Sequence, residues 1–178
     1  MKSLAMLGAA ALLVGLAAFG VACKNGGGGG LSLEEYFQKI DEVQNNNDAT
    51  FATQEASQGE PSADASGEEL ATFVRDSITA SADTLRDTVG KANDIDPPDE
   101  VADPHAGIVA AINDAVTALD DMAGSIPDTV TLADLEQGTF FDNEDLNAAF
   151  DSLATACNAL ETIAADNNIT VDLACDEV

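Results

Sequence analysis

Apolar residues recur every three or four positions in four long segments of the chain, over residues 33–51, 70–92, 108–122 and 146–164. This spacing places them on one face of a helix and leaves the opposite face polar. No strand pattern competes with these segments. The sequence therefore predicts four amphipathic helices that bury their apolar faces against one another.

Local signals mark the ends of the first two helices. Ser32–Glu35 and Ser66–Glu69 have the form of capping boxes, in which side chains satisfy free backbone N–H groups at a helix start. The run Asn45–Asn47 weakens the first apolar stripe, and residues 56–66 predict a loop. The second helix is expected to end before Pro97–Pro98, because proline lacks an amide donor and restricts the residue before it.

The start of the third helix is open to two interpretations. Asp103 caps the helix with Pro104 as its first residue, or the helix begins near Pro98 and bends at Pro104. Residues 124–127 end it.

Residues 131–138 predict a short helix, and Asp142 or Asn143 begins the last long one. Short connections between four long helices predict an all-α fold, an antiparallel, up-and-down four-helix bundle.

The first residues have the three parts of a secretory signal. Met1–Lys2 gives a positive start, residues 4–22 are apolar, and small residues precede the exit. The segment Phe19–Cys23 resembles a bacterial lipobox. That resemblance implies that the Cys23 thiol takes up a diacylglyceryl group and that a peptidase cuts before Cys23. The chain would then be anchored to a membrane by lipid.

One position departs from the lipobox pattern, and it leaves two alternatives. Gly20 stands three residues before Cys23, where the family usually has an aliphatic residue. Gly20–Ala22 also fits an ordinary signal-peptidase site, which would release a soluble protein. Otherwise the apolar run is just long enough to remain as a membrane-spanning anchor.

A run of glycines follows the export segment. Glycine loses much entropy on ordering and has no side chain to pack, so Gly26–Gly30 predicts a flexible tether. The chain then divides into a lipoprotein signal peptide over residues 1–22, a lipidated Cys and Gly-rich tether over 23–31, and an acidic helical-bundle domain over 32–178.

The chain has three cysteines, Cys23, Cys157 and Cys175. With lipid on Cys23, the other two remain as a pair in an oxidising compartment, where a disulfide is expected. Two thiols with no nearby His are too few for a metal site, and a catalytic thiol pair is more often spaced Cys-x-x-Cys.

The geometry permits this disulfide. Cys157 lies on the apolar stripe of the last helix, Asn167–Asn168 offers a helix stop, and residues 169–173 alternate apolar and polar. Nine residues of helix rise about 14 Å. The seven residues that end at Cys175 span up to about 23 Å when extended. The tail can therefore fold back along the helix and bring Cys175 to Cys157.

The C-terminal half resembles a loosely defined set of uncharacterised extracytoplasmic helical lipoproteins. The shared features are Pro97–Pro98 ahead of a helix with His105, the pattern Cys157-x-x-Leu160, and the alternating segment that ends at Cys175. The resemblance implies the helical architecture and the disulfide, and it carries no activity.

The charge balance narrows the possible partners. Thirty-three Asp and Glu residues face six Lys and Arg residues, a formal net charge of −27. Such a surface repels phosphate backbones, so nucleic-acid binding is excluded, while cations and basic partners are not. Aromatic residues are 4% of the chain and Trp is absent, so the core is expected to consist of Ala, Leu, Ile and Val.

Two groups are candidates for a functional role. His105, the only histidine, borders an apolar face, which favours a packed imidazole over a catalytic base. The acidic stretch 94–103 could hold calcium, but solvated charges near a helix start explain it without a ligand.

These observations predict no catalytic, cofactor-binding or metal residues, and no cofactor. We expect a lipid-anchored, extracytoplasmic and non-enzymatic interaction or accessory module of the cell envelope. Its partners would be the membrane, through the lipid on Cys23, and an envelope protein. The alternative is a small-molecule or cation-binding lipoprotein associated with a transporter.

Overall fold

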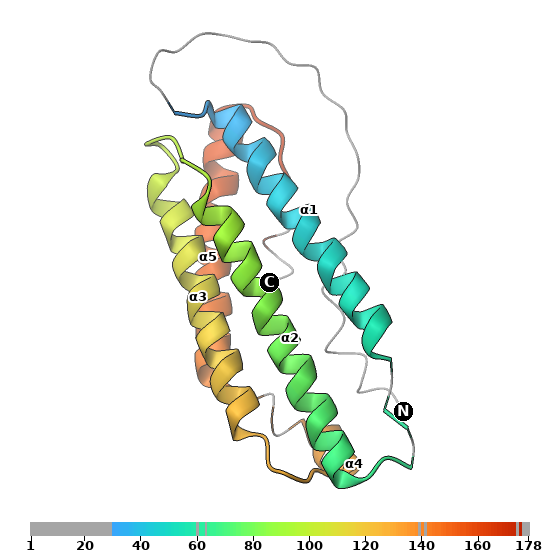
Figure 1. The fold of residues 1–178 in the computed structure, drawn as a ribbon. Helices are drawn as coiled ribbons and strands as arrows, with labels where there is room; N and C mark the ends of the chain where they lie inside the picture. The colour runs from blue at the N-terminus through green and yellow to red at the C-terminus, as the bar shows by residue number, and fades with distance from the viewer. Residues whose placement is uncertain are drawn as a thin grey trace.

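The computed structural model describes residues 30–59, 61–62, 64–138, 140, 142–173 and 175. This part of the chain contains helices and no strand, which confirms the all-helical prediction (Figure 1). The helices are α1 (Leu33–Gln58), α2 (Gly67–Asn93), α3 (Ala102–Ser125), α4 (Leu132–Gln137) and α5 (Glu144–Asp166). The signal segment and Cys23 lie outside the described residues.

Most helix starts lie where the sequence places them. Both predicted capping boxes are formed, because the Ser32 and Ser66 hydroxyls each accept from the backbone N–H three residues on, and the backbone N–H of each serine donates to the glutamate there. A third box, made by Thr131 and Asp134, begins α4. Asn143 caps α5 by accepting from the Leu146 amide at 2.9 Å. These side chains satisfy amide donors that have no partner inside the helix.

The first helix is longer than the sequence predicts. It runs through Asn45–Asn47 and ends at Gln58, so the expected loop over residues 56–66 begins at Gly59, which adopts a positive φ of 63°. The side chains of Asn45 and Asn46 donate to the carbonyls of Asp41 and Glu42, one turn earlier. Their polar groups are thus satisfied within the helix instead of competing with it.

Both interpretations of the start of α3 are wrong. The helix begins at Ala102, after Val101, whose side chain makes no capping bond. Pro104 is the third helical residue, within the first turn, where its missing N–H leaves no intrahelical bond unmade. The chain therefore passes Pro104 without a break, and the His105 amide bonds to the Val101 carbonyl at 2.9 Å.

Helix α3 packs against both α2 and α5, and α1 packs against α2 (Figure 1). Among the described residues, buried apolar side chains form two clusters. The first, here called the tail core, consists of Tyr36, Phe37, Ile95, Val101, Cys157, Leu160, Ala164, Leu173 and Cys175. The second, the α4 core, consists of Leu70, Ala71, Val74, Ile78, Met122, Ala123, Ile126, Val130 and Leu135. Aliphatic residues dominate both clusters, as the composition predicts.

The C-terminal tail, residues 167–173 with Cys175, folds back along α5. Asn168 adopts a left-handed conformation with φ of 58°, and the Ile169 amide donates to the Ala164 carbonyl at 2.8 Å. Cys157 and Cys175 form a disulfide with their Cα atoms 5.5 Å apart. The predicted turn, the returning tail and the disulfide are therefore confirmed.

Candidate functional site

The only tyrosine and the only histidine of the chain meet in the tail core. The hydroxyl of Tyr36, near the start of α1, lies 3.1 Å from Nδ1 of His105, in the second turn of α3. Tyr36 is fully buried, and His105 keeps 6% of its surface exposed. The two rings meet edge to face with centroids 5.7 Å apart. The packed histidine predicted from the sequence is confirmed, whereas its tyrosine partner was not foreseen.

The contacts of His105 define its protonation state. Burial lowers the pKa of the His105 imidazole, against the opposing effect of a hydrogen bond to the backbone of Ala92. The ring is therefore neutral at pH 7. The Tyr36 hydroxyl then donates to Nδ1, so the proton of the neutral ring is on its other nitrogen, and the imidazole also bonds to the backbone of Ala92 at the end of α2.

Tyr36 is held neutral as well, because burial raises the pKa of its hydroxyl. The pair thus connects α1, the end of α2 and the start of α3 through neutral hydrogen bonds. Each side chain has the other as its hydrogen-bond partner inside the core, so the pair joins helices to one another.

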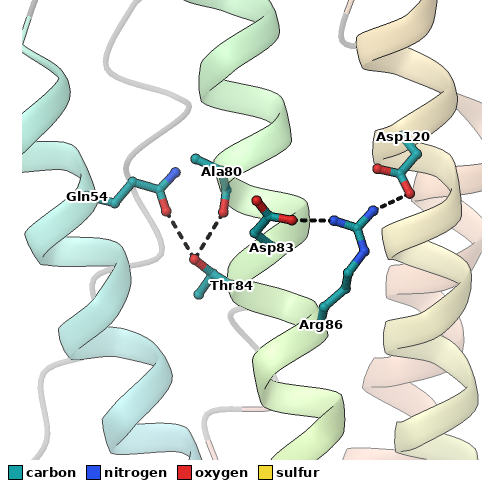
Figure 2. Close-up of polar contacts among 6 residues, drawn as sticks. All are labelled: Gln54, Ala80, Asp83, Thr84, Arg86 and Asp120. Carbon is teal, nitrogen blue, oxygen red and sulfur yellow. Dashed lines mark hydrogen bonds and ion pairs between the residues drawn. The ribbon is translucent and has the colours of Figure 1, made fainter.

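A row of polar pairs joins the second half of α1 to α2. Thr88 Oγ1 lies 2.8 Å from Asn47 Oδ1, Thr84 Oγ1 lies 3.1 Å from Gln54 Oε1, and Ser77 Oγ lies 3.0 Å from Gln58 Oε1. We call these three pairs the polar seam. Figure 2 shows its middle pair, where the Thr84 hydroxyl also points at the Ala80 carbonyl of its own helix. The seam connects α1 to α2 where α1 carries few apolar residues.

Sequence reasoning missed the polar seam, although a signal for it exists. Asn47, Gln54 and Gln58 are spaced by seven and four residues, which puts them on one helix face. A pattern of apolar residues does not reveal a polar stripe with the same period.

Arg86 and Lys91, two of the basic residues of the described chain, form ion pairs at the surface. Arg86 of α2 bonds to Asp83 of its own helix at 2.5 Å and to Asp120 of α3 (Figure 2). Lys91 pairs with Asp87 at 2.7 Å. These side chains are 40–67% exposed, so each pair contributes little to stability.

Arg75 of α2 is bound to backbone instead of a carboxylate. Its guanidinium donates to the carbonyl of Ile126 at 3.1 Å and to that of Pro127 at 3.4 Å. Arg75, Arg86 and Lys91 thus support contacts within the fold, and the acidic residues of the chain far outnumber its basic ones.

The acidic stretch weighed as a calcium site does not gather its carboxylates. Its acidic residues are all exposed: Asp94, Asp96, Asp99, Glu100 and Asp103. Within the described residues, no three His, Cys, Asp or Glu side chains are placed to hold one metal ion. The stretch therefore lies on the surface as a set of separate, solvated charges.

Two open hollows lie on the surface of the described part of the chain. One lies at the start of α2, lined by Ser66, Glu68, Glu69, Thr72, Phe73 and Asp76. The other lies along α1, lined by Asn46, Ala49, Thr50, Thr53, Gln54 and Ser57. Neither includes Tyr36, His105 or the disulfide.

Helices in the described part of the chain lack the combination of length and apolar character needed to cross a membrane. Cys23, the expected lipid attachment site, is not among the described residues. In comparisons with known proteins, the chain matches no family model, no curated protein and no solved structure.

Proposed function

We propose that the chain is a lipid-anchored lipoprotein of the cell envelope, and that its helical domain acts outside the cytoplasm as a non-enzymatic interaction or accessory module. The observation that carries this proposal is the Cys157–Cys175 disulfide, whose residues are 6% and 3% exposed. Stable disulfides form in oxidising compartments and are rare in the cytoplasm. The bond therefore supports export of the domain.

The sequence before the domain supports the lipid anchor. The positive and apolar export segment, the lipobox-like Phe19–Cys23 and the run Gly26–Gly30 follow one another in the order that a tethered lipoprotein requires. Helix α1 begins at Leu33, directly after the glycines. A lipid on Cys23 would thus connect to the domain through a short, flexible spacer.

The arrangement of the long helices is proposed to be an antiparallel, up-and-down four-helix bundle of α1, α2, α3 and α5. Its support is the packing of α3 on both α2 and α5 and of α1 on α2. The connections of α1 to α2 and of α2 to α3 are short, as in bundles whose neighbouring helices run in opposite directions. The short helix α4 would cover one end.

The non-enzymatic role is supported by the use that the fold makes of its buried polar groups. Tyr36 and His105 bond to each other and to backbone, and the polar seam joins α1 to α2. The exposed surface is dominated by carboxylates, which suit a basic protein surface or hydrated cations. Interaction with an envelope protein follows most simply from these properties.

Intact mass of the membrane-bound protein tests the anchor. We expect a chain that starts at Cys23, carries lipid and gains two hydrogens on reduction. The variant Cys23→Ser is the matched control and should lose both the lipid and the membrane association. An unlipidated mass that retains Met1 would overturn the proposal.

Cross-linking in intact cells tests the role. A photoreactive residue at exposed positions such as Asp128 or Glu144 should capture one envelope protein reproducibly. The rival function, a cation- or metabolite-binding lipoprotein, predicts instead a ligand-dependent rise in melting temperature and no specific cross-link.

A further inference from the structure

The C-terminal tail lies between α1 and α5 and bonds to both. The backbone amide of Leu173 donates to Glu161 Oε1 of α5 at 3.1 Å, and its carbonyl accepts from Gln44 Nε2 of α1 at 3.3 Å. In Figure 1 the tail descends from the end of α5 towards α1. One residue of the tail thus uses its two backbone groups to connect two helices.

Apolar side chains of the tail form part of the surface against which α1 packs. Leu173 and Cys175 are buried in the tail core beside Tyr36 and Phe37 of α1 and Leu160 of α5. Ile169 and Val171 pack against the same cluster. The buried apolar residues of α1 therefore lie in its first turns, and the tail supplies part of the surface on which they pack.

Polar contacts also hold α1, beginning with the buried bond between Tyr36 and His105 of α3. The second half of α1 meets α2 through the polar seam, in which hydroxyls of α2 bond to amide oxygens of α1. Such bonds contribute little in net terms, because water offers equivalent partners when the helices separate. By contrast, α3 packs extensively on both α2 and α5.

We infer that the Cys157–Cys175 bond is a redox-dependent clasp that holds α1 on the domain. With the bond closed, the tail stays in place and α1 is docked. With the bond open, the tail beyond the turn at Asn168 must order itself through the two backbone bonds of Leu173 and a few apolar side chains, against its conformational entropy. The tail then detaches, and α1 loses part of the surface on which it packs. Helices α2, α3 and α5 keep their mutual packing.

The redox chemistry balances with a disulfide as the oxidant. On closing, the thiols of Cys157 and Cys175 lose two protons and two electrons and form one S–S bond, while a protein or small-molecule disulfide is reduced to two thiols. A dithiol reductant reverses the exchange. The clasp depends on the proposed envelope location only for the supply of this oxidant.

The clasp has a consequence for the order of events during export. In a reducing cytoplasm the bond stays open, so α1, the helix nearest the export segment, is not docked. Docking follows oxidation outside the cytoplasm. The domain would thus complete its fold only after it has crossed the membrane.

Amide hydrogen exchange on the full chain, purified in detergent, tests the clasp. On reduction, exchange should accelerate at least about tenfold in residues 33–58 and 167–173, and stay within about twofold in α2, α3 and α5. The double variant Cys157→Ser/Cys175→Ser should reproduce the reduced pattern without reductant. Unchanged exchange in α1, or equal acceleration in all helices, would overturn the inference.

A second pair of variants tests the tail separately from redox chemistry. Leu173→Ala removes the buried side chain with the disulfide intact, and the exposed Thr170→Ala is its matched control. Only Leu173→Ala should accelerate exchange in α1. If both variants leave α1 protected, the tail does not hold it. Because these measurements use purified protein, their failure would leave the proposed location untouched.

Discussion

The Tyr36 hydroxyl and the Nδ1 atom of His105 lie 3.1 Å apart, and the bond between them joins two helices across 69 positions of sequence. Both side chains are buried, so neither can exchange its partner for water. The chain carries no other tyrosine or histidine and no tryptophan. Tyrosine fluorescence therefore reports on this one contact.

Tyr36→Phe should destabilise the protein by about 1–3 kcal/mol, because it leaves a buried imidazole nitrogen without a donor. Urea unfolding followed by far-UV circular dichroism measures the change. Ser152→Ala is the control, since it removes an exposed hydroxyl that bonds only to its own helix, and it should stay within about 0.5 kcal/mol. An unchanged urea midpoint for Tyr36→Phe would show that the bond contributes nothing.

Stability should fall as pH drops below 6.5, the ordinary pKa of histidine, because burial lowers the pKa of His105 in the folded chain. The unfolded chain then binds a proton that the folded chain does not. The loss ends at the folded pKa, and its slope is limited to about 1.4 kcal/mol per pH unit for one proton.

The free energy of unfolding, measured from about pH 7.5 to about pH 5, should lose this slope in His105→Gln. The capping carboxylates of Glu35, Glu69 and Asp134 do not interfere, since hydrogen bonds lower their pKa values and their stabilisation is lost only at more acid pH. Asp48→Asn is a further control, because burial raises the pKa of Asp48 and gives the opposite slope. The same slope in His105→Gln and the unsubstituted chain would contradict the assignment.

Thr88→Val should loosen the second half of α1. The substitution keeps the shape of the side chain but removes the 2.8 Å bond to Asn47, at a cost of about 1 kcal/mol. Hydrogen exchange should accelerate in α1 beyond Asn47 more than in α3. Thr117→Val is the matched control, because its exposed hydroxyl bonds only to the Asn113 carbonyl one turn earlier. Equal acceleration of exchange in α1 by the two variants would contradict the role of the polar seam in holding α1 on α2.

Salt should stabilise the domain. At a net charge of −27 the carboxylates repel one another, and ions screen this repulsion over about 10 Å at about 0.1 M salt. The melting temperature should therefore rise between about 0.05 M and about 1 M NaCl. Calcium chloride at matched ionic strength should give a similar rise, and a much larger one would favour the cation-binding alternative. A constant melting temperature would mean that repulsion is negligible.

Much of the fold could be predicted from local sequence. Ser32 and Ser66 mark helix starts because a cap involves only neighbouring residues, and the alternation over 169–173 revealed a tail that could return to Cys157. Val101 gave no such signal, because its side chain makes no capping bond at the start of α3. The Tyr36–His105 bond and the polar seam join residues far apart in sequence, which periodicity within one segment cannot reveal.

The bond from Gln44 to the Leu173 carbonyl spans 129 positions, whereas the packing of α2, α3 and α5 involves segments closer along the chain. Contacts between distant segments form late, because the long loop between them must close first. Loop closure costs conformational entropy before any contact can offset it. Helical domains usually fold fast through local contacts. In this domain, α2, α3 and α5 should pack together first. The docking of α1, completed by the tail, should be the slow final folding step.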